Sequence, residues 1–133
     1  MSSKDKTSKL ISVNDVRIIP IGGAGEIGKS CTIVEQGEDI VVVDCGLAFP
    51  SEEMLGVDIV IPDFTYLLEN KERVRAVFLT HAHEDHTGSL SFLLNDMKVP
   101  VYGTEFTLAI VRTKLEERLN LKDVDLRTMK AGD

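Results

Sequence analysis

Runs of apolar and β-branched residues, separated by short polar breaks, predict the strands of this chain. The runs are residues 16–21, 31–35, 40–43, 57–61, 74–79 and 99–102. Turn-forming residues at 36–39 join the second run to the third, so a hairpin that ends at Asp44 is expected there. The run at 74–79 is apolar apart from Arg75, which indicates a strand buried inside a sheet.

Apolar residues at helical spacing predict helices at residues 63–73, 90–97 and 104–119. Asp63 is expected to cap the first helix and Thr104 the third. The polar residues after Asn120 carry no pattern that predicts a further element.

The polar residues 1–12 are expected to be a disordered lead-in, and residues 13–133 a single structural unit without internal repeats or a linker. The lead-in lacks the apolar stretch that a secretory signal needs after its basic start. No apolar run approaches the roughly 20 residues of a membrane span. Cys31 and Cys45 are the only cysteines and are expected to be reduced and buried, as in a cytoplasmic protein.

Composition narrows the function classes. The chain has 133 residues, of which 43% are hydrophobic and 28% charged, as in an ordinary globular domain. Its net charge of −7 argues against binding of nucleic acid through a generally basic surface. It leaves open a site where metal ions supply the positive charge.

The glycine-rich stretch at 22–30 fits two nucleotide-binding patterns. Gly23-x-Gly25-x-x-Gly28 matches the dinucleotide fingerprint, and residues 23–30 match the phosphate-binding P-loop. Both sites require a helix directly after the loop. The β-branched run that follows predicts a strand, so a turn between strands is the preferred interpretation. A P-loop nucleotide binder stays as an alternative, to be tested by nucleotide titration of Lys29→Ala.

All three histidines lie within one six-residue stretch, at positions 81, 83 and 86, directly after the buried strand. In an extended segment His81 and His83 point to the same side. A turn into the helix at 90–97 lets Asp85 and His86 face the same pocket. Imidazole and carboxylate ligands suit zinc or manganese, and two ligands for each of two metals is the natural division. Buried core histidines, a solvated polar loop and a structural zinc site are the less favoured interpretations.

The pattern His81-x-His83-x-Asp85-His86 resembles the signature of the metallo-β-lactamase superfamily. Asp44, in Asp44-Cys45-Gly46 at a strand end, resembles the aspartate that supports the metal loop there through hydrogen bonds. The resemblance implies an α/β fold, specifically the N-terminal half of an αββα sandwich, a mostly β layer with flanking helices. Such a half exposes apolar surface, which a longer parent chain or an oligomer is expected to cover.

Four further stretches are similar to the ribonuclease J family: residues 22–29, 53–58, 61–67 and 100–104. That resemblance implies a metal-dependent ribonuclease, both 5′-to-3′ exonuclease and endonuclease, acting in RNA maturation and mRNA decay. Its cofactors would be two divalent ions, zinc first and manganese or magnesium as alternatives. Its partners would be RNA and, in the full-length protein, identical or paralogous subunits, with no membrane involved.

Under this resemblance His81 and His83 would hold one metal and Asp85 and His86 the other, with Asp85 and His86 as the catalytic pair. The family's remaining ligands, its β-CASP insert and its C-terminal domain have no counterpart here, so the chain is expected to be truncated and almost inactive alone. The rival hypotheses are a small-molecule hydrolase of the thioesterase or glyoxalase type and a non-catalytic scaffold that keeps the motif.

Overall fold

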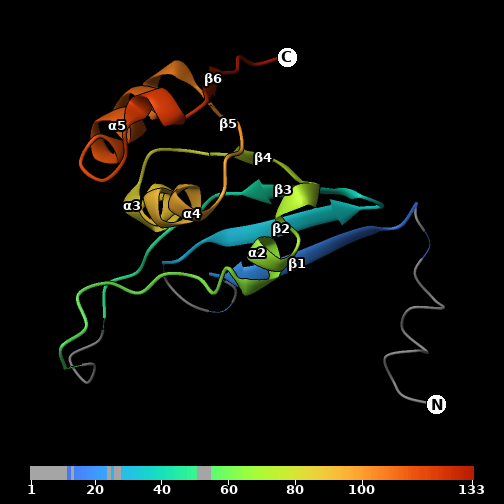
Figure 1. Cartoon of the computed structure of the whole chain (residues 1–133), viewed down its shortest axis with the longest axis horizontal. Coiled ribbons are helices and arrows are strands. Elements are labelled where there is room, and N and C mark those ends of the chain that lie inside the picture. Colours follow the sequence, from blue (N-terminus) through green and yellow to red (C-terminus); the bar gives the residue numbers. More distant parts are fainter. Residues whose placement is uncertain (1–11, 13, 24, 26–27, 51–54) are drawn as a thin grey trace.

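The computed structural model describes residues 12, 14–23, 25, 28–50 and 55–133, and in this part six strands form one mixed sheet. The strands lie side by side in the sheet in the same order as in the sequence (Figure 1). The first two pairings are antiparallel and the other three are parallel. The strands are β1 Val16–Gly22, β2 Cys31–Gln36, β3 Asp39–Val43, β4 Val74–Phe78, β5 Val101–Gly103 and β6 Leu126–Thr128.

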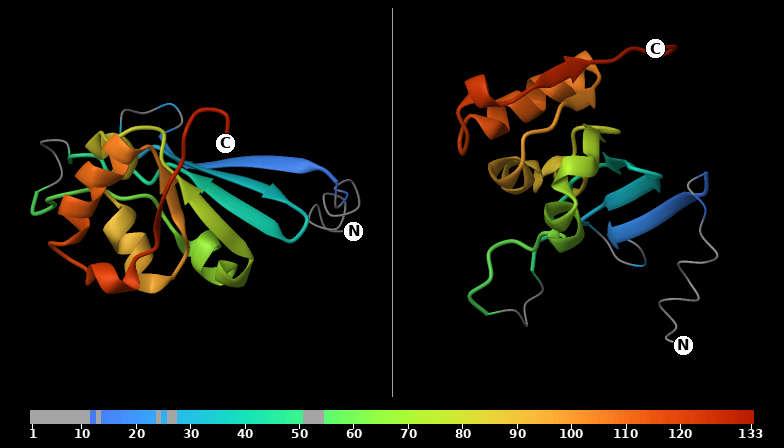
Figure 2. Two further views of the ribbon diagram at one scale, coloured as in Figure 1. Left: turned by 90° about the horizontal axis from the view of Figure 1, so that it is seen from above. Right: turned by 45° about the vertical axis from the view of Figure 1, so that its right-hand side comes forward.

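The helices gather on one side of this sheet, as the view from above in Figure 2 shows. None of those described is long and apolar enough to cross a membrane. They are α2 Thr65–Glu69, η1 Lys71–Arg73, α3 Glu84–Thr87, α4 Leu90–Asp96, α5 Glu105–Leu115 and η2 Leu121–Asp123. The predicted lead-in, residues 1–12, lies outside the described residues except for Ser12.

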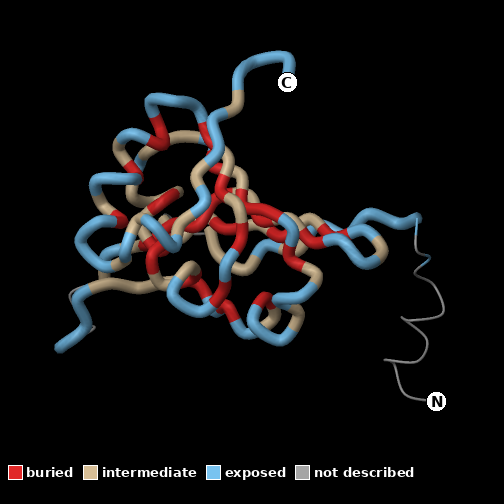
Figure 3. Tube along the Cα trace, turned by 45° about the horizontal axis from the view of Figure 1, so that its top comes forward, coloured by how far each residue is buried: buried red, intermediate tan, exposed pale blue. Residues whose placement is uncertain are grey.

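The core lies between the sheet and the helices. Ile33, Val42, Val77 and Val101, on four neighbouring strands, are fully buried and belong to one apolar cluster with Leu93 of α4. Figure 3 shows the buried residues in the middle of the molecule, with the C-terminal tail exposed. The apolar area removed from water here is the main source of stability.

The opposite face of the sheet is open. The strand register places Ile18 beside Val34, and Val34 beside Val41, on the face that does not carry the core residues. Val16 and Ile18 are 56% and 70% exposed. Within the part of the chain that the structure describes, no element covers these side chains. A mixed sheet with helices on one face and apolar side chains on the other confirms the expected α/β half-sandwich.

The prediction of a strand at residues 57–61 is wrong. Only an isolated bridge forms there, in which Ala48 and Val60 exchange two backbone hydrogen bonds of 2.8 Å. An apolar run makes a strand only where a neighbouring strand accepts its hydrogen bonds, and the described residues supply that neighbour at Val60 alone.

The helix predicted at residues 63–73 is shorter. Its N-cap is Phe64 and not Asp63, whose carboxylate instead accepts a hydrogen bond of 2.9 Å from the Thr65 N–H. Asn70 ends α2, and its side-chain amide donates to the Tyr66 carbonyl at 2.8 Å. Short polar side chains compete with the helical backbone in this way, so the chain continues as a 3-10 turn.

The C-terminal part contains one confirmed cap and two elements that the sequence pattern misses, the 3-10 turn η2 and the strand β6. Thr104 caps α5 and accepts a hydrogen bond from the Thr107 N–H at 3.3 Å. The strand expected at 99–102 begins only at Val101, because Pro100 has no N–H to give to the ladder. The missed strand, β6, is a polar edge strand that pairs in parallel with β5.

A buried carboxylate stabilises the end of the sheet remote from the histidines. Glu35 of β2 is 5% exposed and pairs with Arg17 and Arg73, each at 3.0 Å. It also accepts a hydrogen bond from the Tyr66 hydroxyl. Burial, and then this hydrogen bond to Glu35, raises the pKa of Tyr66 above its ordinary value.

The raised pKa of Tyr66 predicts a loss of stability at alkaline pH. The folded state favours the neutral phenol of Tyr66. The stabilisation of the folded state by this phenol is therefore fully present below the unfolded pKa of about 10, and it is lost as the pH rises through the folded pKa. We expect Tyr66→Phe to flatten this alkaline decline, measured as unfolding free energy against pH in urea. Tyr102→Phe is the control, and an equal flattening by that variant would contradict the assignment.

Candidate metal centre

The histidine segment begins where two parallel strands end. β3 ends at Val43 and β4 at Phe78, and these two residues are register partners. Asp44 directly follows β3, and Thr80 and His81 follow β4. Ligand sites of open α/β sheets lie beyond the carboxyl ends of such strands, because the loops of neighbouring strands meet there.

Three of the four predicted metal ligands form a cluster. The ligand atoms of His81, Asp85 and His86 all lie within 4.8 Å of one another. Nε2 of His86 is 3.4 Å from a carboxylate oxygen of Asp85, and the rings of His81 and His86 are 3.9 Å apart. Two imidazoles and a carboxylate at this spacing are donors that suit zinc and manganese.

His83 lies at the margin of this cluster. Its ring is 4.8 Å from that of His81 in an edge-on arrangement, and the residue is exposed. His83 is also the N-cap of α3, and its carbonyl accepts hydrogen bonds from the His86 and Thr87 N–H groups. The division of the four ligands into two pairs therefore stays a prediction.

Asp44 supports the cluster through hydrogen bonds of its buried carboxylate. It is 3% exposed and its carboxylate accepts hydrogen bonds, each of 2.7 Å, from the Thr80 N–H, the Thr80 hydroxyl and Nδ1 of His86. Its backbone has φ 65°, a left-handed conformation that aspartate and asparagine adopt more readily than most residues other than glycine. Hydrogen bonds of this kind orient metal-bound histidines, which favours the supporting role expected for Asp44.

Backbone hydrogen bonds join the residues after Asp44 to the segment that carries the proposed ligands, residues 81–86, called the metal loop below. The Cys45 N–H donates to the His86 carbonyl at 2.7 Å, and the Leu47 N–H donates to the Glu84 carbonyl at 3.0 Å. Between them, a Cβ atom on Gly46 would lie 1.7 Å from the Asp85 carbonyl oxygen. Glycine is therefore required at position 46 for the two segments to approach this closely.

The sequence interpretation did not predict the roles of Thr80 and Gly46. Thr80 stands directly before His81, and Gly46 is the last residue of the Asp44-Cys45-Gly46 motif. Their positions in or beside the motifs are the only signal they carry, because their contacts join segments far apart in the sequence.

The two cysteines are buried free thiols, as expected. A hydrogen bond with Cys45, followed by burial, raises the pKa of the Cys31 thiol well above its usual range. The Cys45 sulfur lies 3.3 Å from the Ser89 hydroxyl. Both cysteines belong to the buried apolar core and not to the cluster of His81, Asp85 and His86.

The described part of the glycine-rich stretch leads directly into a strand. β2 begins at Cys31, and a Cβ atom on Gly28 would lie 2.8 Å from that of Ala48. Because no helix follows the loop, the dinucleotide and P-loop patterns lack the helix N-terminus that binds phosphate. The described residues of the stretch thus agree with the turn between strands that the sequence analysis favoured.

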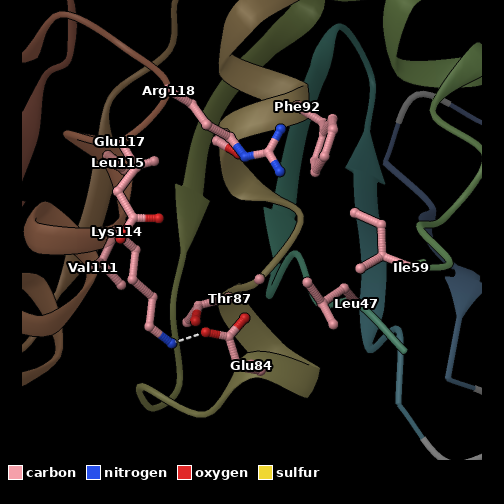
Figure 4. A pocket seen from close by; sticks show the side chains of 12 residues that line it. Leu47, Ile59, Glu84, Thr87, Phe92, Val111, Lys114, Leu115, Glu117 and Arg118 are labelled. Atoms are coloured by element: carbon pink, nitrogen blue, oxygen red, sulfur yellow. Dashed lines mark hydrogen bonds and ion pairs between the residues drawn. The ribbon is translucent and has the colours of Figure 1, made fainter. Parts of the chain in front are cut away.

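A small pocket adjoins the metal loop between α3, α4 and α5. Its volume is about 160 Å³, and Glu84 and Thr87 of α3 border it together with Leu47. Figure 4 shows Glu84 directed into this pocket, where it forms an ion pair with Lys114 of α5. This pair ties the helix that carries Asp85 and His86 to α5.

Comparison with known proteins agrees with the fold and the motif. The sequence model of the Metallo-beta-lactamase superfamily matches residues 24–126. Ribonuclease J2 of Bacillus subtilis (strain 168) is 51% identical over 116 residues, which are 87% of this chain and 21% of that protein. Ribonuclease J 2 of Staphylococcus aureus (strain MRSA252) is 49% identical over 104 residues, 78% of this chain and 19% of that protein. The chain spans about a fifth of the length of these relatives.

Solved structures share the fold at low sequence identity. The metallo-beta-lactamase fold protein YhfI from Bacillus subtilis matches with a TM-score of 0.57 and 19% identity, over 89% of this chain and 47% of that chain. A long form RNase Z from yeast matches with a TM-score of 0.53 and 16% identity, over 96% of this chain and 18% of that chain. The resemblance to ribonuclease J is thus confirmed over most of the chain, which belongs to the metallo-β-lactamase superfamily.

Proposed function

We propose that this chain contributes part of the active site of a metal-dependent ribonuclease of the ribonuclease J type. The observation that carries the proposal is the cluster of His81, Asp85 and His86 beyond the ends of β3 and β4. The identity of about half to ribonuclease J proteins supports RNA as the substrate over a small thioester.

The donor set fits divalent metal ions. Two such ions, when bound, would activate a water and stabilise charge on the leaving oxygen of a phosphodiester. His81, His83, Asp85 and His86 are the proposed ligands, with zinc as the first choice and manganese or magnesium as alternatives. Metal analysis of the protein purified without chelators identifies the native ion.

Asp85 and His86 are proposed to act at the reacting water. The Asp85 carboxylate is 46% exposed and lies 3.4 Å from Nε2 of His86, so its oxygens are accessible from solvent. A carboxylate in this position can orient the water or accept its proton. Asp44 holds the opposite nitrogen of His86, which keeps Nε2 directed toward Asp85.

RNA cleavage by the native-length protein tests the proposal. We expect cleavage of a labelled 5′-monophosphate RNA that is abolished by chelation, restored by one divalent metal and lost in Asp85→Asn. Asp125→Asn is the matched control, because Asp125 is a similarly exposed carboxylate paired with Arg127 on β6. Turnover of a thioester without RNA cleavage would favour the small-molecule hydrolase, and metal binding that alters stability alone would favour the scaffold.

The length of the native polypeptide is a second prediction. Because the curated relatives are about five times longer, we expect an antibody against residues 108–120 to detect a product several times larger than 14.7 kDa. The 133-residue chain alone is expected to bind metal weakly and to cleave RNA poorly. Robust cleavage by that chain, abolished by His83→Ala, would contradict this prediction.

The remaining proposals concern location and assembly. We propose a cytoplasmic enzyme that acts in RNA maturation and mRNA decay, as exonuclease and endonuclease, and forms homo-oligomers or hetero-oligomers with a paralogue. The open apolar face of the sheet supports the need for further chain or a subunit to cover it. Cell fractionation and the mass of the native complex test these two points.

A further inference from the structure

We infer that Thr80 is a positioning residue that orients His81 for metal binding by relaying a hydrogen bond from Asp44. The inference rests on the proposed metal site and adds a residue to it. The Thr80 hydroxyl lies 2.7 Å from the Asp44 carboxylate and 3.0 Å from Nδ1 of His81.

The chemistry of the three groups sets the direction of each hydrogen bond. The Asp44 carboxylate only accepts, so the single hydroxyl proton of Thr80 is donated to it. The Thr80 oxygen is then left as the acceptor toward His81, and Nδ1 of His81 must carry the proton. Nε2 of His81 keeps its lone pair, which is the form in which an imidazole binds a metal.

The same carboxylate thereby sets the tautomer of two histidines. An Asp44 oxygen lies 2.7 Å from Nδ1 of His86, which donates to it directly, while His81 is reached through Thr80. Both rings present Nε2 as the free donor. A neutral imidazole without such a partner exchanges its proton between the two nitrogens, and part of its population cannot bind metal through Nε2.

The backbone holds Thr80 in register for this relay. Its N–H donates to the other Asp44 oxygen at 2.7 Å, and the preceding Leu79 is 1% exposed with its N–H bonded to the Tyr102 carbonyl at 2.8 Å. Thr80 itself is exposed, so water competes for its hydroxyl. We therefore expect an effect at the lower end of the range for groups that orient metal ligands.

Metal affinity of the native-length protein, measured by chelator competition with Zn²⁺ and no RNA, tests the relay. We expect Thr80→Val, which removes the hydroxyl at similar volume, to weaken binding about 10-fold. Thr80→Ser keeps the hydroxyl and is expected to restore binding to within about 3-fold of the parent. In a His81→Gln background Thr80→Val should cost nothing further, because the ligand that Thr80 orients is gone.

Thr87→Val is the control for a merely structural threonine. The Thr87 hydroxyl contacts the carbonyl oxygens of Ala82 and His83, at 3.2 and 3.1 Å, and no imidazole. We expect Thr87→Val to lower metal affinity by the same factor in the parent protein and in the His81→Gln background. An equal loss for Thr80→Val in both backgrounds, or no loss at all, would overturn the inference.

The tautomer of His81 gives a readout that needs neither metal nor RNA. In ¹⁵N-histidine-labelled, metal-free protein at alkaline pH, we expect the nitrogen shifts of His81 to show a proton on Nδ1 in the parent and Thr80→Ser, and a mixture in Thr80→Val. An Nε2-protonated His81 in the parent would overturn the inference. The protein could show the expected His81 tautomer, and an effect of Thr80→Val that depends on His81, without cleaving RNA. That result would contradict the ribonuclease proposal and still support the role of Thr80.

Discussion

Replacing Asp44 with asparagine is expected to weaken divalent metal binding by about 10- to 100-fold, the usual range for a partner that orients metal ligands. The Asp44 carboxylate accepts three hydrogen bonds of 2.7 Å, two from Thr80 and one from His86. An amide has one acceptor oxygen, and its nitrogen can only donate. The Thr80 hydroxyl and Nδ1 of His86 share one Asp44 oxygen, and the Thr80 N–H uses the other. With the amide nitrogen at the shared position both histidines lose their orienting acceptor, and with it at the other position the Thr80 N–H faces an amide N–H.

Asparagine is the informative replacement because it tolerates the left-handed backbone at this position, where φ is 65°. The loss of stability should be confined to the unsatisfied polar group, about 1–3 kcal/mol. Metal affinity by chelator competition and unfolding free energy in urea measure the two effects. Asp39→Asn is the matched control, since Asp39 is an exposed carboxylate at the other end of β3 that pairs with Arg75. Unchanged metal affinity in Asp44→Asn would exclude the supporting role.

Replacing Gly46 with alanine is expected to lower both stability and metal affinity. The added Cβ atom would lie 1.7 Å from the carbonyl oxygen of Asp85 and 2.3 Å from its carbonyl carbon. These are backbone atoms, so the metal loop itself must move. We expect a loss of about 3 kcal/mol, at the upper end for overpacking, and a fall in Tm of roughly 10 °C.

Gly56→Ala separates this clash from ordinary glycine effects. Gly56 has φ +79° and nothing within 4 Å of an added Cβ atom, so alanine there costs only the left-handed backbone, about 1–2 kcal/mol. Its metal affinity is expected to stay unchanged. Calorimetry and chelator competition on both variants make the comparison. A Gly46→Ala protein that binds metal as the parent does would show that the loop does not depend on this approach.

Local pattern was sufficient for several elements of the fold. Alternating and continuous apolar runs identified β1 to β4, since a strand that packs on a core carries its signal in its own residues. Thr104 identified the start of α5 because capping is a contact within one helical turn. The same approach failed at β6, which is a polar edge strand stabilised by pairing with β5 and not by burial.

The sequence was enough to predict the chemistry of the site, because its imidazoles and its Asp85 carboxylate lie within one six-residue stretch after a buried strand. Which atoms come into contact depends on the tertiary structure. Asp44 reaches Thr80 and His86 across 36 and 42 residues, and these contacts exist because β3 and β4 pair in parallel. Hydrogen-bond partners this distant leave no periodic trace in a sequence, and neither does the close approach that requires glycine at position 46.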